Sequence, residues 1–243
     1  MDKEKKLQLL EEAFAEIHLR LESYQYEQFL QYYEMLIEKN KVMNLTSITE
    51  FEEVIHKHFA DSVVNFEKIV DNSKKISLID VGTGAGFPGI PIKIVYPFIK
   101  IVLLDSLNKR VKFLQEVIES LELQDIIAIH SRAEDAGRNV QYRETFDYCV
   151  SRAVANLATL SEYCLPFVKV GGCFISYKAG AVEEELEQSK KAIQLLGAEV
   201  EEKKDFILPN TDIHRSMIYI RKVKSTSQRY PRKSGMPSKE PLK

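Results

Sequence analysis

The stretch SLIDVGTGAGFPGIP, residues 77–91, constrains the fold of this chain of 243 residues more than any other. It begins with an apolar run that predicts a strand, and Pro88 suits the first turn of a helix. Between them lie four glycines: Gly82, Gly84, Gly86 and Gly89. Glycines let the backbone adopt positive φ and let a ligand come close. A strand, a glycine turn and a helix are typical of an open parallel sheet that binds ligands at its carboxyl edge.

Downstream of residue 75, short apolar runs alternate with amphipathic segments, which predicts a parallel sheet with helices on both faces. Residues 198–208 and 215–223 have no helix between them and predict an antiparallel hairpin at the sheet edge. We therefore expect an α/β, Rossmann-like fold with a seven-stranded, mostly parallel sheet. The five strands expected before the hairpin are Ile76–Val81, Ile101–Asp105, Ile126–His130, Phe146–Val150 and Cys173–Tyr177.

The chain is expected to divide into three parts. Residues 1–74 have no glycine and show helical apolar spacing, so they predict an N-terminal helical subdomain. Residues 75–223 form the cofactor-binding domain, and residues 224–243, rich in Pro, Ser and Lys, predict a basic tail that is extended or disordered when free. From residue 221 onward there are eight basic residues and one acidic residue, a net charge of +7. This asymmetry favours a polyanionic partner, with a merely solvated terminus as the alternative.

Other features limit the cellular setting. The three cysteines show no CxxC spacing and have apolar neighbours, which is typical of buried free thiols in a reducing cytosol. The charged N-terminal stretch does not resemble a signal peptide, and no apolar run is long enough to span a membrane. His56, His58 and Asp61 lack a further ligand at helical spacing, so no metal is expected. We expect a cytoplasmic monomer.

Two glycine fingerprints overlap in residues 80–89. One, GxGxxG from Gly84, is typical of dinucleotide-binding dehydrogenases, and the other, DxGxGxG from Asp80, is typical of S-adenosylmethionine (SAM) methyltransferases. An acid at the strand end repels a pyrophosphate but attracts the ammonium group of SAM, so Asp80 favours SAM over NAD. In this register Gly82, Gly84 and Gly86 surround the cofactor.

The ends of later strands supply further candidates. Asp105 ends the second strand, where a carboxyl group can accept both ribose hydroxyls of an adenosine. Ala133 and Glu134 follow the third strand and are expected at the adenine edge, with a helix cap as the alternative. Arg152 follows the fourth strand and is expected to face the ligand-binding cleft at the carboxyl edge of the sheet. Methyl transfer to a free lone pair is an in-line displacement that depends on positioning, so we expect Arg152 to position the reactants.

Seven segments occur together and in the same order as in the RsmG (GidB) family of guanine-N7 methyltransferases that act on 16S ribosomal RNA, and the chain resembles this family. The segments are NLTSI, HFADS, DVGTGAGFPGIP, DSLNKRVKFL, RAED, SRAVA and YPRKSGMPSKEPL. The resemblance implies a class I SAM-dependent methyltransferase that modifies N7 of one guanine in 16S rRNA or the small ribosomal subunit. It also implies that Gly82, Phe87, Ala133, Glu134 and Arg152 contact the cofactor.

The acceptor side is less constrained. Guanine N7 needs no deprotonation, and it lies on the edge that a regular A-form helix hides, so the target guanine must be unpaired. Basic side chains would contact phosphates, and a tyrosine could stack on a base. Candidate RNA-binding residues are Asn44, His58, Lys178, Arg229, Tyr230, Arg232 and Lys233. The alternatives are a SAM-dependent enzyme that acts on another RNA or a small molecule, and an NAD-dependent dehydrogenase or non-catalytic nucleotide-binding protein.

Overall fold

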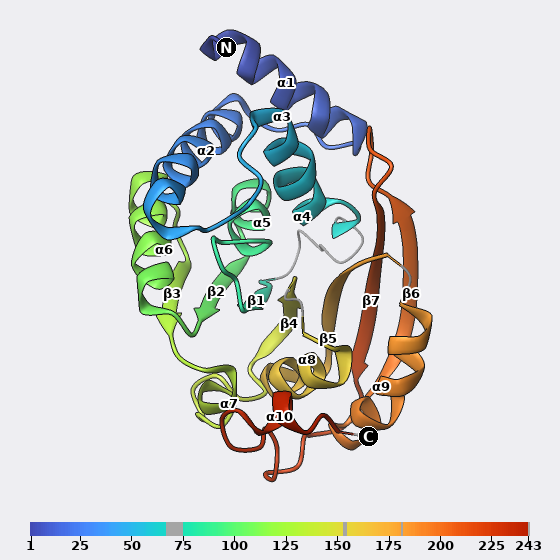
Figure 1. The fold of residues 1–243 in the computed structure, drawn as a ribbon. Helices are drawn as coiled ribbons and strands as arrows, with labels where there is room; N and C mark the ends of the chain where they lie inside the picture. The colour runs from blue at the N-terminus through green and yellow to red at the C-terminus, as the bar shows by residue number, and fades with distance from the viewer. Residues whose placement is uncertain (67–74, 153–154, 181, 243) are drawn as a thin grey trace.

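A seven-stranded sheet lies at the centre of the computed structural model, which describes residues 1–66, 75–152, 155–180 and 182–242 (Figure 1). The strand order is β3-β2-β1-β4-β5-β7-β6; β1 to β5 pair in parallel, and β7 runs antiparallel to β5 and β6. The strands are β1 (Ser77–Val81), β2 (Lys100–Asp105), β3 (Ile126–His130), β4 (Phe146–Ser151), β5 (Val168–Ala179), β6 (Ala198–Ile207) and β7 (His214–Lys222). The predicted α/β architecture and its edge hairpin are confirmed.

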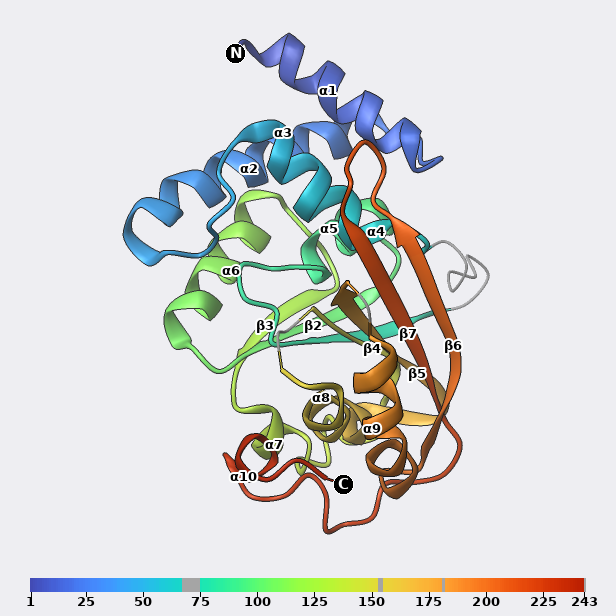
Figure 2. The same cartoon turned by 45° about the vertical axis from the view of Figure 1, so that its right-hand side comes forward.

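Helices cover both faces of the sheet (Figure 2). One face carries α1 (Lys3–Glu16), α2 (Ser23–Met43), α3 (Phe51–Val54), a π-helical turn (Ile55–Ala60), α4 (Asp61–Val63), α5 (Gly89–Val95) and α6 (Asn108–Ser120). The other side carries α7 (Ala133–Ala136), α8 (Leu157–Cys164), a 3-10 turn (Leu165–Phe167), α9 (Glu183–Leu195) and α10 (Met236–Lys239). The N-terminus and the C-terminal segment therefore lie on opposite sides of the sheet.

Each face of the sheet has its own apolar core. The N-terminal helices share one core with the sheet: Phe14 contacts Phe29 at a ring-centroid distance of 4.8 Å, and Phe29 contacts Phe59 at 4.9 Å. Burying an aromatic side chain of this kind contributes about 1.5–3 kcal/mol. The division into a helical subdomain and a cofactor-binding domain stays a prediction, and its boundary at residue 74 lies outside the described residues. The helices nevertheless pack directly on the sheet that carries the glycine turn.

The glycine turn is held by backbone contacts between β1, β2 and α5. The amides of Gly82 and Thr83 donate to the carbonyl oxygen of Leu104, at 2.9 and 3.2 Å, and Gly82 has a φ of 72°. Gly89 begins α5, where a Cβ atom would lie 2.3 Å from Leu103 Cδ2 and 2.8 Å from Asp80 Oδ2. The absence of a side chain at Gly89 therefore lets the helix approach the sheet closely.

Gly89→Ala is expected to destabilise the fold by about 1–3 kcal/mol, because the added methyl group overpacks the contact between α5 and β2. Gly171→Asn is the matched control: Gly171 has a φ of 86° with open space around its Cβ position, and Asn tolerates that conformation. The measurement is urea unfolding of both variants. Equal stability of Gly89→Ala and the wild type would contradict the tight approach.

The C-terminal segment, residues 224–242, corrects the expectation of an extended or disordered tail. It packs on the α7 and α8 side of the sheet (Figures 1 and 2). The Arg143 guanidinium donates to the carbonyl oxygens of Thr226 and Tyr230, at 2.7 and 2.8 Å. Composition alone suggested disorder because it does not reveal which residues elsewhere in the chain form hydrogen bonds with a polar segment.

The cysteines lie in the interior of the protein. Cys149, Cys164 and Cys173 are free and buried. Within the described ranges, no helix is both long and apolar enough to cross a bilayer.

Candidate cofactor and acceptor site

Two neighbouring cavities open at the carboxyl edge of the parallel strands, and Ala155 lines both. The glycine-turn cavity, about 220 Å³ in volume, is bounded by residues that include Gly82, Asp105, Ala133 and Glu134. The arginine cavity, about 590 Å³, is bounded by residues that include Lys57, His58, Asp61, Arg152, Tyr177, Lys178 and Arg215. Concave sites of this kind at the carboxyl ends of strands are where α/β sheets bind ligands.

Asp105 is oriented at the edge of the glycine-turn cavity by the backbone. Its Oδ2 atom accepts a hydrogen bond from the Gly84 amide at 3.0 Å, and its Oδ1 atom accepts one from the Leu107 amide at 2.8 Å. Arg110 Nη1 lies 3.6 Å from Oδ2. Each carboxyl oxygen has a second lone pair, so the group can still accept the two neighbouring hydroxyls of a ribose. Gly84 adds open space, because nothing lies within 4 Å of its Cβ position.

Glu134 lines the same cavity, so its predicted place beside the adenine stays a prediction, and its carboxyl group also bonds to a distant segment. Its Oε1 atom accepts a hydrogen bond from the Gly235 amide at 2.7 Å, so it binds the C-terminal segment and does not cap α7. Ala133 lines the cavity beside it, as expected for an adenine-facing position. The sequence did not indicate that Gly235 and Ser238 of the C-terminal segment, or Tyr163 of α8, also line this cavity.

Asp80 lies beneath the glycine turn, which corrects the expectation that it faces the cofactor. Its side chain is fully buried, and its Oδ2 atom accepts hydrogen bonds from Thr83 Oγ1 at 2.6 Å and from the Gly89 amide at 2.9 Å. Its Oδ1 atom has no hydrogen-bond partner among the described residues. Burial raises the pKa of Asp80 to about 7. Close packing of α5 on the sheet covers this carboxyl group, which ties the turn to the helix.

Gly86 and Phe87 pack against side chains of the helical layer, and their predicted contact with the cofactor stays a prediction. A Cβ atom on Gly86 would lie 2.7 Å from the hydroxyl of Tyr32, which itself donates to the Ala85 carbonyl oxygen at 2.6 Å. Phe87 is buried, with its ring stacked on His58 at a centroid distance of 4.6 Å. The glycine at position 86 therefore lets α2 pack against the turn.

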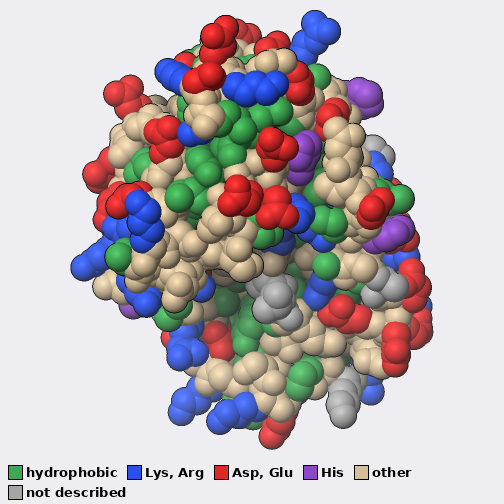
Figure 3. All heavy atoms as spheres, turned by 45° about the horizontal axis from the view of Figure 1, so that its top comes forward, with side chains coloured by type: hydrophobic (Ala, Val, Ile, Leu, Met, Phe, Trp, Pro, Cys, Tyr) green, Lys and Arg blue, Asp and Glu red, His purple; other side chains and the backbone are tan. Residues whose placement is uncertain are grey.

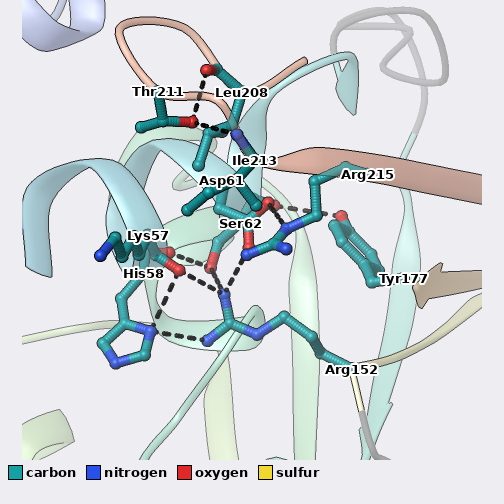
Figure 4. A network of polar contacts seen from close by, with 10 residues as sticks. All are labelled: Lys57, His58, Asp61, Ser62, Arg152, Tyr177, Leu208, Thr211, Ile213 and Arg215. Carbon is teal, nitrogen blue, oxygen red and sulfur yellow. Dashed lines mark hydrogen bonds and ion pairs between the residues drawn. The ribbon is translucent and has the colours of Figure 1, made fainter. Parts of the chain in front are cut away.

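Arg152 lies in a network of polar contacts that joins the end of β4 to the N-terminal helices (Figure 4). Its guanidinium lies 4.9 Å from the ring centre of Phe87, a distance typical of a cation–π contact. Arg152 Nη1 lies 3.3 Å from Asp61 Oδ2, and Arg215 Nε donates to Asp61 Oδ1 at 2.9 Å. The buried carboxyl group of Asp61 thus holds two guanidinium groups on one side of the cavity. The sequence indicated Asp61 only through the HFADS segment and as part of a metal site that was rejected, and nothing in it indicated Arg215.

His58 completes this network on the helical side. Nη2 of Arg152 lies 3.3 Å from Nδ1 of His58, and Nε2 of His58 lies 2.8 Å from Thr46 Oγ1. Burial, and next the positive charge of Arg152, lower the pKa of His58 to about 3. The imidazole is therefore neutral at neutral pH and adds no charge next to the guanidinium. The π-helical turn that carries His58 is a local geometry often found at functional sites.

The structure separates the predicted RNA-binding residues into paired and exposed ones. Lys178 Nζ donates to the Ala155 carbonyl oxygen and lies 2.8 Å from Glu185 Oε1, so its charge is matched inside the arginine cavity. Asn44 ends α2 in the left-handed conformation, with a φ of 50°, and does not line either cavity. Asn44 thus ends α2, and its predicted contact with RNA stays a prediction.

Arg232 also departs from the prediction of a free phosphate-binding side chain. Its guanidinium and backbone amide both donate to the fully buried carboxyl group of Glu162. Arg229 and Lys233 are exposed, whereas Tyr230 packs partly against the core on this face of the sheet. Only these two exposed cations of the predicted set remain free at the surface in the structure described here.

The surface above the helical layer carries mixed charges (Figure 3). Acidic side chains gather over this layer, and the face is hollowed near its centre, where Lys and Arg side chains lie beside acidic ones. Such a mixture favours selective contacts at the cavity more than broad attraction of a polyanion.

The seven-stranded sheet, the glycine turn and the fixed carboxyl group at the end of β2 define a Rossmann-like, SAM-dependent methyltransferase. The family model described as rRNA small subunit methyltransferase G matches residues 25–214, and the chain belongs to this family. It is 53% identical over 231 residues to Ribosomal RNA small subunit methyltransferase G of Lachnoclostridium phytofermentans, with 95% of each chain covered. It is also 53% identical over 242 residues to the protein of that name from Acetivibrio thermocellus, with 99% of each covered.

A solved structure shows the same fold at low sequence identity. P. horikoshii TYW2 in complex with MeSAdo has a TM-score of 0.50 and 18% identity, over 62% of this chain and 58% of that chain. The resemblance drawn from the seven sequence segments is confirmed by the family match. The dehydrogenase interpretation of the glycine turn is wrong.

Proposed function

We propose that this methyltransferase transfers the methyl group of SAM to N7 of an unpaired guanine in 16S rRNA. The adenosine part of SAM occupies the glycine-turn cavity, and the guanine enters the arginine cavity. The observation that carries this assignment is the shared wall at Ala155, which brings the two cavities together at the carboxyl edge of the sheet. The family match and the SAM-dependent class support the reaction type.

The cofactor-binding residues follow from this placement. The open space at Gly84 and the oriented carboxyl group of Asp105 fit a ribose, and Gly82 and Ala133 line the remaining cavity. When bound, SAM supplies an electrophilic methyl group on a sulfonium centre. The protein itself orients the two partners and excludes water. No general base is needed, because guanine N7 presents its lone pair without losing a proton.

The cationic side of the arginine cavity suits the acceptor. A donor placed on N7 would block the lone pair that attacks, whereas a donor placed on the neighbouring O6 atom leaves it free. We therefore assign Arg152 and Arg215 to guanine O6 or to the adjacent phosphate oxygens. Asp61 keeps their guanidinium planes fixed. Arg229 and Lys233, exposed on the C-terminal segment, are assigned to more distant phosphates.

The setting follows from the substrate. An enzyme that modifies 16S rRNA works in the cytoplasm, and three buried free cysteines suit a reducing compartment. We propose a monomer as the working unit.

The test is incorporation of labelled methyl groups from SAM into naked 16S rRNA and into assembled small subunits. Treatment with borohydride and then aniline cleaves RNA at 7-methylguanine, so a single cleavage site is expected in whichever RNA is the substrate. Free guanosine and a transfer RNA serve as parallel acceptors for the alternative of another RNA or a small molecule. No incorporation into either ribosomal substrate would overturn the proposal, and label without cleavage would overturn the N7 assignment.

A further inference from the structure

The C-terminal segment forms part of the glycine-turn cavity. Gly235 and Ser238 line this cavity together with Asp105 and Ala133. These two residues follow Ala133 by about a hundred positions in the sequence, and they reach the cavity because α10 packs beside α7 and α8 (Figures 1 and 2). A cofactor in the glycine-turn cavity therefore contacts a wall made by the last residues of the chain.

One strong contact holds this wall on α8. The fully buried carboxyl group of Glu162 accepts hydrogen bonds from the backbone amide of Arg232 at 2.7 Å, from its Nε at 3.0 Å and from its Nη2 at 2.7 Å. The same short helix, α8, brings Leu160 and Tyr163 to the cavity. Bidentate pairing of this kind fixes geometry as well as charge. Arg232 thus sets the distance between the C-terminal segment and the cavity side of α8.

Further contacts hold the wall on α7. The Gly235 amide donates to Glu134 Oε1 at 2.7 Å, and Ser234 Oγ donates to Asp135 Oδ1 at 3.1 Å. Gly235 has a φ of 87°, which glycine adopts readily. Ala133, at the start of α7, lines the cavity that these contacts close. The segment that faces adenine in the proposed placement is therefore bonded to the C-terminal segment and not only to the sheet.

We propose that residues 232–240 are an integral wall of the SAM-binding site, with Arg232 as a positioning residue that acts through Glu162. The inference rests on the proposed placement of SAM in the glycine-turn cavity. Binding of the cofactor and docking of the segment must then stabilise each other, because the coupling between two binding equilibria is reciprocal. The basic residues of this segment are thereby divided between cofactor binding and the surface.

The experiment is isothermal titration of the full-length protein with SAM and with S-adenosylhomocysteine. Arg232→Ala is expected to raise both dissociation constants by about tenfold, which corresponds to the loss of one charged hydrogen-bonding contact. Arg232→Lys, which keeps the charge but loses the fork, is expected to recover part of the affinity. Lys224→Ala changes an exposed residue of the C-terminal segment that lies outside residues 232–240; it is the matched control and is expected to bind like the wild type.

A second variant and a second measurement keep the test decisive if Arg232→Ala folds poorly. Ser238→Phe adds bulk at an exposed residue on the cavity wall and is expected to weaken SAM binding without loss of thermal stability. SAM is also expected to slow tryptic cleavage after Lys233 in the wild type. Wild-type affinity in both variants, or cleavage unaffected by SAM, overturns the inference alone. A wild type that binds no SAM overturns the proposed function as well.

Discussion

Replacing Arg152 with Ala is expected to lower the rate of rRNA methylation by roughly 100-fold, the size of effect that misplacement of a reacting group produces. The guanidinium bridges the buried Asp61 and the face of Phe87, so its removal leaves the arginine cavity without the group that joins its two sides. The measurement is single-turnover methyl transfer to 16S rRNA. Because Arg152 does not line the glycine-turn cavity, SAM affinity should change much less than the transfer rate.

Arg152→Lys is the matched variant, since it keeps the positive charge but cannot make the planar contacts to Asp61 and His58 together. We expect it to remain well below the wild type in transfer rate. Thermal melting of both variants separates a lost function from a lost fold, because Arg215 still pairs with Asp61 when Arg152 is gone. Full activity of Arg152→Ala in a folded protein would contradict the positioning role.

The strands and the glycine turn could be predicted from the sequence because their signals are local. An apolar run such as Ile126–His130 encodes a strand in its own few residues, and the glycines show where the backbone must turn. The positions of Asp105 and Ala133 at one cavity follow from the rule that parallel strands present their carboxyl ends at one edge. Local pattern and general topology together were enough for this half of the site.

The other half depends on contacts between residues far apart in the chain. The sequence did not indicate that His58 and Tyr32 of the helical layer pack against the ring of Phe87. Arg232 was expected to be free, but Glu162, 70 positions earlier in the chain, takes its charge. No sequence pattern near Phe87 or Arg232 indicates these partners. From the sequence alone, a charged residue in a polar segment is therefore predicted to be exposed to solvent, because its distant partner is not known.

The burial of Asp80 also could not be predicted from the residues around it, and it leads to the second large expected effect, on the stability of the fold at different pH values. Its native pKa is raised to about 7 by burial, whereas an aspartate in the unfolded chain titrates near ~3.9. Below the unfolded pKa both states hold the proton, and as the pH rises toward 7 only the unfolded state releases it. Stability of the wild type is therefore lost as the pH rises through this window. Asp80→Asn stays neutral throughout and should not show that loss.

The expected result is that, between pH 5 and pH 8, the free energy of unfolding of the wild type falls relative to that of Asp80→Asn by about 3 kcal/mol. The asparagine oxygen still accepts from Thr83 Oγ1 and from the Gly89 amide, so the turn keeps both contacts. Urea unfolding at each pH is the measurement. Parallel stability curves for the two proteins would show that the buried carboxyl group titrates normally.

Asp147→Asn is a control of opposite sign. Burial alone would raise the pKa of Asp147, but hydrogen bonds from Lys169 and Ser77 outweigh it and lower that pKa. Its charge therefore stabilises the fold above the unfolded pKa, and that contribution is lost as the pH falls. Asp147→Asn should cost stability at pH 8, where Asp80→Asn gains it.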